Sequence, residues 1–292
     1  MAHNGKDVVG VEELGKILKT AMAQSSVGSP SEGDLIGEDG LVICGKCGAP
    51  KQCRVKSPFN GETKVVWCKC ACEEREEAER AAREKAEQAA AWAEAQRDEC
   101  FASAAFLRTC TFEADDRANP QASTACERYA DTFSRNDRYG LILYGGVGTG
   151  KSFMAAAIAN RVIDRGFTAL QTDIGSIATV MESSFEKRQR NLARILAYDL
   201  LVVDDIGAQR STEYMMQHVY SVIDGRYRQG KPMVITTNLD FEGLSGGLAS
   251  GPWGRVFDRI SEVCYPVEFA GKSRRRVKSV EMRKTMRTRL GL

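Results

Sequence analysis

Glycine, lysine and serine recur at a phosphate-binding spacing in the segment GGVGTGKS, residues 145–152. The pattern Gly-x4-Gly-Lys-Ser lets backbone N–H groups approach phosphate oxygens without interference from Cβ atoms. In such a loop Lys151 reaches the β- and γ-phosphates and the Ser152 hydroxyl binds Mg²⁺. The sequence therefore predicts a P-loop that takes ATP and Mg²⁺, formed by Gly145, Gly146, Val147, Gly148, Thr149, Gly150, Lys151 and Ser152.

Two adjacent aspartates end the apolar run LLVVDD, residues 200–205. At the end of a strand beside the P-loop, Asp204 is placed to give the Mg²⁺ on Ser152 its second protein contact. Asp205 then faces the attacking water, in a position where glutamate, one methylene longer, is commoner. Because a misplacement near 1 Å can cost about a hundredfold in rate, the pair predicts slow hydrolysis.

Five cysteines form two clusters at metal-ligand spacing. The first is a C-x-x-C pair followed by Gly48, which can adopt the left-handed turn of a zinc knuckle, and the second is a C-x-C-x-C group about 20 residues later. The members are Cys44, Cys47, Cys68, Cys70 and Cys72. Two thiolate pairs suit one tetrahedral Zn²⁺, which leaves either Cys68 or Cys72 as the spare; an iron–sulfur cluster and free thiols are the alternatives. Cys53 has no partner at ligand spacing.

Composition limits the class of protein. With 43% hydrophobic and 27% charged residues, the 292-residue chain suits one full globular domain and a smaller module. It has no apolar run of about 18 residues, and its N-terminus lacks the basic-then-apolar plan of a signal peptide. We therefore expect a cytoplasmic protein without membrane contact, whose ten cysteines are metal ligands or core residues rather than disulfides.

Apolar runs alternate with helix-length intervals through the second half of the chain. A strand at 141–144 precedes the P-loop, and a helix runs from Ser152 to Gly166. Further strands are expected at 167–173, 200–205, 232–238 and 265–269. This alternation predicts an α/β fold with a parallel sheet and crossover helices.

Three segments outside this core have distinct compositions. Residues 11–22 place Val11, Leu14, Leu18 and Met22 on one helical face, which packs on its own domain or docks on a partner. Residues 73–99 hold ten acidic and five basic side chains without Gly or Pro, which favours a solvated spacer helix over a coiled-coil site. Residues 272–292 hold nine Lys/Arg and one Glu, which suits nucleic acid or an acidic protein.

These features divide the chain into four parts. Residues 1–72 form an N-terminal helix and zinc-finger module, and residues 73–100 a charged helical linker. Residues 101–276 form the nucleotide-binding core, and residues 277–292 a basic tail.

The P-loop, the acidic strand, the strand VITTNL and the segment GRVFDRI together resemble the AAA+ ATPases of the DnaC/IstB-like group, which comprises helicase loaders and transposition helpers. The resemblance covers residues 101–276. The cysteine finger followed by a charged helix is similar to phage and prophage members of this group. Only about 20 residues follow the last strand, so we expect one basic helix and no full C-terminal lid.

The resemblance implies roles for four polar residues. Asn238 resembles the sensor I residue that positions water, and Arg259 resembles the arginine finger offered to a neighbouring subunit's nucleotide, with Arg255 as the alternative. Arg275 resembles the sensor II arginine. Because three arginines stand in a row, Arg274 and Arg276, one position away on either side, are the alternatives.

The resemblance also implies a function. The expected protein is a slow ATPase that forms a homo-oligomer with ATP, binds a hexameric replicative DNA helicase and places it on single-stranded DNA. A transposition helper acting on duplex DNA and a nucleotide-gated scaffold that never hydrolyses are the alternatives. Phe185, Lys187, Arg188 and Arg190, on an expected helix, suit either a DNA contact or a plain solvated face.

Overall fold

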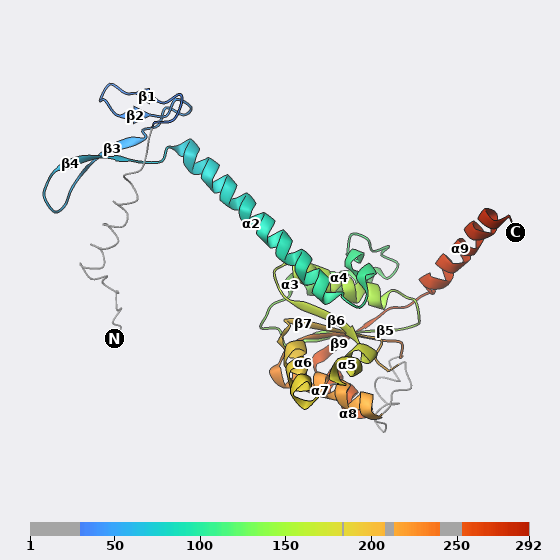
Figure 1. Ribbon diagram of the computed structural model, residues 1–292. Helices are drawn as coiled ribbons and strands as arrows, with labels where there is room; N and C mark the ends of the chain where they lie inside the picture. Colours follow the sequence, from blue (N-terminus) through green and yellow to red (C-terminus); the bar gives the residue numbers. More distant parts are fainter. Residues whose placement is uncertain (1–29, 183, 208–212, 240–252, 292) are drawn as a thin grey trace. The chain divides into compact units, whose positions relative to one another are not determined.

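The computed structural model describes residues 30–182, 184–207, 213–239 and 253–291 (Figure 1). The chain divides into two compact units, one ending at Glu87 and the other beginning at Gln88. The amphipathic helix expected at residues 11–22 lies outside the described residues. None of the helices in the described ranges combines the length and apolarity needed to cross a membrane.

The first unit is built on two short antiparallel strand pairs. Strand β1 (Leu35–Ile36) pairs with β2 (Val42–Ile43), and β3 (Gln52–Lys56) pairs with β4 (Thr63–Trp67). Its buried hydrophobic cluster comprises Cys44, Cys70 and Cys72 with Ala49 packed against them. Because three of these four residues are cysteines, the unit has little other apolar material from which to gain folding free energy.

A buried lysine ties the first unit together. The side chain of Lys51 is 6% exposed, and its Nζ lies 2.7 Å from a carboxylate oxygen of Glu73 and 2.9 Å from one of Asp34. The hydrogen bonds to Glu73 and then Asp34 raise the pKa of Lys51. The ammonium thus links the turn before β1 to the first turn of helix α2 (Ala71–Cys100).

Helix α2 differs from a fully solvated arm at its C-terminal end. Ala93 and Cys100 are buried in the core of the second unit, and Arg97 donates a 3.2 Å hydrogen bond to Asn160. The spacer character predicted from composition therefore applies to the exposed turns before Ala93, whereas the last turns are part of the second unit.

The second unit contains a five-stranded parallel sheet in the order β6-β7-β8-β5-β9. Its strands are β5 (Gly140–Tyr144), β6 (Ala169–Asp173), β7 (Leu200–Asp204), β8 (Met233–Thr237) and β9 (Cys264–Glu268). All five expected strands form, each within two residues of the expected ends. Strand β8 is buried along its whole length, as a parallel strand covered on both faces should be. The α/β fold with a parallel sheet is confirmed.

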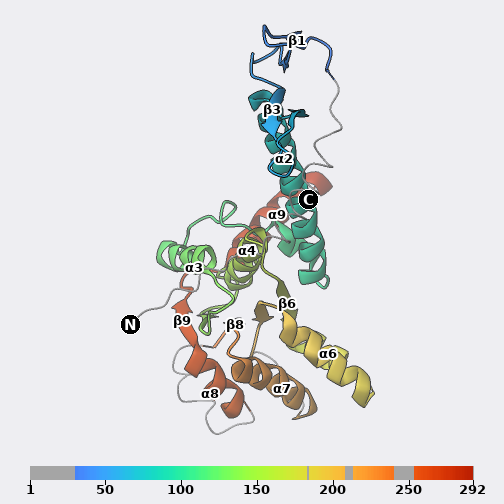
Figure 2. The same ribbon diagram turned by 90° about the vertical axis from the view of Figure 1, so that its left-hand side faces the viewer.

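Helices cover both faces of the sheet (Figures 1 and 2). On one face lie η1 (Ala105–Thr109), α3 (Pro120–Thr132) and α4 (Lys151–Asp164). On the other face lie α5 (Ile174–Met181), α6 (Phe185–Ala197), α7 (Glu213–Gln229) and α8 (Gly254–Val263). Successive residues of β5 alternate between them: Leu141 and Leu143 pack with the first group and Ile142 with the second. After β9 the described chain forms one more helix, α9 (Arg274–Leu290).

A buried arginine joins three elements on the second face. Arg226 of α7 is fully buried, and its guanidinium donates to the carbonyl oxygens of Leu196, Tyr198, Asp199 and Pro232. These carbonyls belong to the end of α6 and to the segments entering β7 and β8. Burial lowers the pKa of Arg226 to about 10.

Strand β9 forms one edge of the sheet described here. It pairs with β5, and Pro266, opposite Ile142, contributes no backbone N–H. The neighbouring Tyr265 side chain is exposed. Proline is found on edge strands because an edge strand has unpaired backbone groups on its outer side.

Candidate nucleotide site and cysteine cluster

The candidate nucleotide site lies where three parallel strands end. Strand β5 leads into the P-loop, β7 ends at Asp204, and β8 lies between them in the sheet. Because parallel strands end at the same edge, the residue that follows β8, Asn238, is placed between the P-loop and the aspartates. The topology thus accounts for the convergence of residues that are far apart in the sequence.

The P-loop runs from Gly145 to the first turn of α4. Gly150 begins the helix in a left-handed conformation, with a φ of 106°, and Ser152 is half-buried in the first turn. Thr149 is buried, and its Oγ1 donates a 2.9 Å hydrogen bond to the carbonyl oxygen of Gly146. The loop therefore has a defined conformation at a helix N-terminus, where backbone N–H groups and the helix dipole favour phosphate.

A chain of hydrogen bonds crosses the site from the lysine to the second aspartate. Lys151 Nζ donates to the carbonyl oxygens of Gly145 and Gly146, at 2.8 and 2.7 Å, and to Asn238 Oδ1 at 2.8 Å. Asn238 Nδ2 donates in turn to Asp205 Oδ1 at 2.5 Å. One amide side chain thus contacts both the P-loop lysine and the carboxylate expected to face water.

Thr236, in β8, holds the two aspartates, a role that no motif in the sequence indicated. Its buried hydroxyl donates to Asp204 Oδ1 and accepts a 2.8 Å hydrogen bond from the backbone N–H of Asp205. The next residue, Thr237, donates to the carbonyl oxygen of Ile206 at 2.7 Å. The paired threonines before Asn238 were the available signal, but their partners become apparent only when β8 lies beside β7.

Asp205 has an uncommon backbone conformation, with a φ of +58°. Among residues with a Cβ atom, aspartate and asparagine enter this left-handed region most readily, because their short polar side chains can bond locally. The conformation is a physical reason for aspartate rather than glutamate at this position. Burial, and then the charge of Asp204, raise the pKa of Asp205, while Lys151 and Arg275 oppose the shift.

The arginine triplet at the start of α9 has different surroundings at each position. Arg274 is held by Asp116 and donates to the carbonyl oxygen of Thr149, so its guanidinium is already engaged. Arg275 is exposed, and its charge lowers the pKa of both Lys151 and Asp205. Because Arg274 is already bound by Asp116 and the Thr149 carbonyl, Arg275 remains the predicted sensor II arginine.

The start of α9 approaches the P-loop closely enough to require glycine there. A Cβ on Gly150 would lie 1.6 Å from Arg274 Nη1, and one on Gly148 would lie 2.2 Å from Ser273 Oγ. Both glycines also have positive φ, of 106° and 79°. A larger residue at Gly148 would collide with Ser273, and one at Gly150 would displace the Arg274 guanidinium from the Thr149 carbonyl.

The two candidate finger arginines lie on α8 and contact α7. Arg259 Nε lies 3.4 Å from Asp224 Oδ1, and its guanidinium stacks 4.6 Å from the centre of the Tyr227 ring. Arg255 lies 5.5 Å from the centre of the Tyr220 ring. Arg259 is one-third exposed, and its contacts with Asp224 and Tyr227 hold it at the surface of the second unit.

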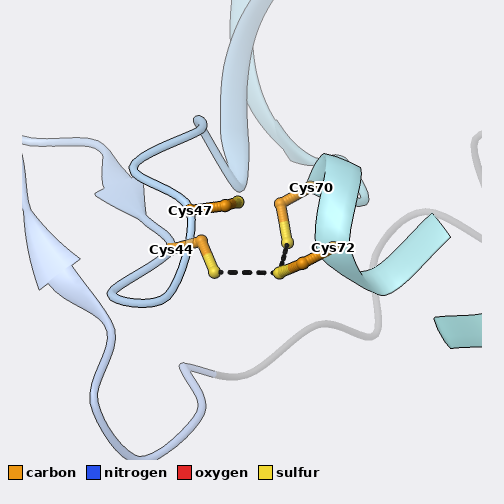
Figure 3. Close-up of side chains that lie close together, drawn as sticks. All are labelled: Cys44, Cys47, Cys70 and Cys72. Carbon is orange, nitrogen blue, oxygen red and sulfur yellow. Dashed lines mark hydrogen bonds between the residues drawn. The ribbon is translucent and has the colours of Figure 1, made fainter. Parts of the chain in front are cut away.

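Four cysteine sulfurs converge in the first unit (Figure 3). Cys44 and Cys47 come from the loop after β2, and Cys70 and Cys72 from the start of α2. All four sulfur atoms lie within 4.8 Å of one another. In a tetrahedral zinc–thiolate site with Zn–S near 2.3 Å, sulfurs lie about 3.8 Å apart. The group could therefore hold a metal ion, and its donor set suits zinc.

The structure selects Cys72 over Cys68 for this group. Cys68 follows β4, where its N–H donates to the backbone carbonyl oxygen of Lys51 and its Sγ lies 3.7 Å from the carbonyl oxygen of Pro50. Backbone N–H groups of Cys47 and Lys46 donate to the Cys44 sulfur and lower its pKa to about 6. The loop after β2 therefore stabilises a thiolate, which is the form that binds metal. Cys68, one of the five candidate ligands, is thereby excluded from the four-sulfur group.

We expect one zinc ion per chain, measurable by elemental analysis. Cys47→Ser and Cys70→Ser should each remove it and unfold the first unit, because structural zinc contributes on the order of 10 kcal/mol to such modules. ATP binding should persist, because the P-loop belongs to the other unit. Cys68→Ser is the matched control and should retain zinc. Iron in place of zinc, or equal loss of metal in all three variants, would contradict the assignment.

Helix α6 presents the basic cluster expected from the sequence. Phe185 is 71% exposed, and Lys187 and Arg190 are exposed, whereas Arg188 is half-buried. Arg194, one turn further along, pairs with Glu99 of α2, which also accepts a hydrogen bond from Tyr198. The exposed aromatic and cations remain available to a ligand such as DNA.

Comparison with known families and proteins gives consistent matches. Residues 69–282 match the family of IstB-like ATP-binding proteins. The protein YdaV of Escherichia coli (strain K12) is 30% identical over 120 residues, 40% of this chain and 47% of YdaV. The replicative helicase loader DnaC of the same strain is 28% identical over 160 residues, 52% of this chain and 63% of DnaC. The chain therefore spans less than two thirds of the length of these relatives.

Among solved structures, the crystal structure of the DnaC helicase loader superposes with a TM-score of 0.52 and 20% identity. The match covers 57% of this chain and 100% of that chain. At this identity the likeness is evidence for the fold alone, and it agrees with the parallel sheet described above.

Proposed function

Because the chain belongs to the IstB/DnaC-like AAA+ ATPase family, we propose that it is an ATP-switched loader that places a hexameric replicative helicase on single-stranded DNA. The observation that carries the proposal is the row of hydrogen bonds from Lys151 through Asn238 to Asp205, at the strand ends beside the P-loop. ATP with Mg²⁺ on Ser152 and Asp204 would occupy this site. Hydrolysis is slow and serves as a timer rather than as a motor.

The first unit supplies the contact with the helicase. Outside its cysteine cluster, the unit exposes large apolar side chains: Leu35 is 58% exposed, Ile36 78% and Phe59 75%. Exposed apolar side chains on a small metal-stabilised unit suit docking on a protein partner. The name of the relative DnaC, a replicative helicase loader, supports this choice of partner.

The second unit supplies nucleotide-dependent contact with DNA and with other copies of the chain. ATP bound at one P-loop is contacted by Arg259 of a neighbouring subunit, so the assembly forms in the ATP state and loosens when the γ-phosphate leaves. Helix α6, with exposed Phe185, Lys187 and Arg190, faces the DNA strand. By linkage, DNA that binds the ATP form more tightly must also tighten ATP.

Fluorescence anisotropy of a labelled single-stranded oligonucleotide tests the switch. We expect tighter binding with a non-hydrolysable ATP analogue than with ADP, and no difference between nucleotides for Lys151→Ala, which loses the phosphate contact. A pull-down should show the hexameric helicase captured by the full chain and not by a Cys70→Ser chain, whose first unit is unfolded. Equal affinities with both nucleotides would reject the loader mechanism, and preference for duplex would favour a transposition helper.

A further inference from the structure

Helix α9 is a dense positive surface outside the nucleotide site. Residues 274–290 contain eight Lys/Arg side chains and one acidic residue, Glu281. Every residue from Val280 to Leu290 is exposed. The helix is about 25 Å long at 1.5 Å per residue.

The basic residues of this helix outnumber its acidic residue by eight to one. Arg283 and Arg287 are four residues apart, where like charges on a helix repel each other. An exposed helix of this length also lacks the tertiary packing that stabilises most helices in proteins. A polyanion that neutralises the cations would remove the repulsion and favour the helix.

The distribution of the cations favours nucleic acid over a protein groove. A protein groove binds one face of a helix. On α9, however, Arg283 and Arg287 lie on one side and Arg289 on another, and the side chains between them are Met282 and Met286. A phosphate backbone presents repeated identical charges, so cations on several faces can bind it without a fixed register.

The first residue of α9 is hydrogen bonded to the P-loop. The backbone N–H of Arg274 donates to the carbonyl oxygen of Gly148 at 2.9 Å, and its guanidinium donates to that of Thr149. Asp116 holds the same guanidinium, with Nε 2.9 Å from Oδ2. A change in the phosphate-binding loop therefore acts directly on the first turn of the helix.

We propose that α9 binds the sugar–phosphate backbone of single-stranded DNA, and that Arg274 couples this contact to the nucleotide on the P-loop. The inference rests on the proposed function and deepens it, because it names a DNA-binding surface and its link to ATP. Helix α6 and α9 then contribute separate parts of the DNA contact.

The double variant Arg283→Gln/Arg287→Gln tests the surface in the full chain. Each phosphate contact on a single strand contributes about 0.7 to the slope of log K against log salt concentration. The variant should therefore reduce the slope by about 1.4 and weaken oligonucleotide binding about 25-fold at 0.1 M salt. Its ATP hydrolysis without DNA should equal that of the wild type.

The matched control is Arg80→Gln/Arg83→Gln, the same loss of charge at exposed positions of α2. It should leave both the affinity and the salt slope unchanged. Wild-type affinity and slope in the α9 variant would overturn the proposal, as would equal losses in the control. Loss of helicase capture in Met282→Gln/Met286→Gln, with DNA binding intact in the α9 arginine variant, would instead assign α9 to a protein partner.

Asp116→Asn tests the coupling, because it weakens the hold on Arg274 while leaving the cations of α9 in place. At saturating nucleotide, the ratio of DNA affinities between the ATP analogue and ADP should fall towards one. An unchanged ratio would overturn the coupling. If the wild type binds DNA equally well with the ATP analogue and with ADP, the proposed function fails. If the wild type binds DNA more tightly with the ATP analogue and the α9 arginine variant binds DNA normally, only the α9 proposal fails.

Discussion

Protein carrying Arg259→Ala should bind ATP as the wild type does and hydrolyse it at least about 10³-fold more slowly, because a finger arginine acts mainly on charge that develops in the transition state. Arg259 lies on α8, where Asp224 and the Tyr227 ring hold its guanidinium at the surface. The contacts described for Arg259 are with α7 and with Asp258 rather than with the P-loop, so in the proposed role it acts on the nucleotide of a neighbouring subunit. Equilibrium binding of a fluorescent ATP analogue and steady-state phosphate release measure the two quantities separately.

Mixing two inactive variants tests whether Arg259 acts between subunits. Lys151→Ala cannot hold nucleotide but keeps Arg259, and Arg259→Ala keeps its P-loop but lacks the finger. Mixed oligomers should regain part of the activity, because some interfaces then combine an intact P-loop with an intact finger. Arg255→Ala, which removes the other arginine stacked on α7, is the matched control and should hydrolyse ATP normally. Normal hydrolysis by Arg259→Ala would exclude it as the finger.

Asp205→Asn should retain ATP and Mg²⁺ binding and lose about 10³-fold in single-turnover hydrolysis, within the range expected for loss of a general base. Asparagine preserves the size of the side chain and tolerates the φ of +58°, but it cannot accept a proton from water. The wild-type rate should fall in acid at a pH above the usual aspartate range, because burial and Asp204 raise the pKa of Asp205 and its protonated form is inactive. Full activity of Asp205→Asn would show that Asp205 is not the group that accepts a proton from the attacking water.

A substitution at Thr236 tests whether the positions of Asp204 and Asp205 matter for hydrolysis, without altering either carboxylate. Thr236→Val keeps the shape of the side chain but removes the hydroxyl that contacts Asp204 and the Asp205 N–H. We expect a loss of about 10- to 100-fold in turnover, as for other residues that orient metal or water ligands, with little change in the nucleotide dissociation constant. Thr236→Ser should restore activity, which a general packing defect would not.

The nucleotide site was largely predictable because its signals are local. A P-loop is one continuous stretch of chain, and the run that ends at Asp204 and Asp205 reads as a buried strand without reference to its neighbours. The role of Thr236 was not predictable, because it depends on β8 pairing with β7, which brings residues about 30 positions apart into hydrogen-bond contact. The assignments of Asn238, Arg259 and Arg275 rest on family resemblance and remain predictions.

The cysteine cluster shows the same limit of local reasoning. Spacing alone left Cys68 and Cys72 equivalent as ligands. In the structure the two cysteines differ. The backbone N–H of Cys68 bonds to the backbone carbonyl of Lys51 at the end of the β3–β4 hairpin, whereas the first turn of α2 brings Cys72 beside Cys70. Lys51 was likewise missed, since nothing in the sequence marks a lysine that is buried between Asp34 and Glu73.

The position of Pro266 has a consequence for how copies of this chain can associate. A sheet with a regular outer strand can be extended by the strand of another molecule, which is a common route to uncontrolled aggregation. Pro266 breaks the row of backbone donors on β9, so a further strand cannot pair along the whole of that edge. Strand addition at this edge is therefore disfavoured, so any contact between copies that involves β9 has to use side chains rather than backbone pairing.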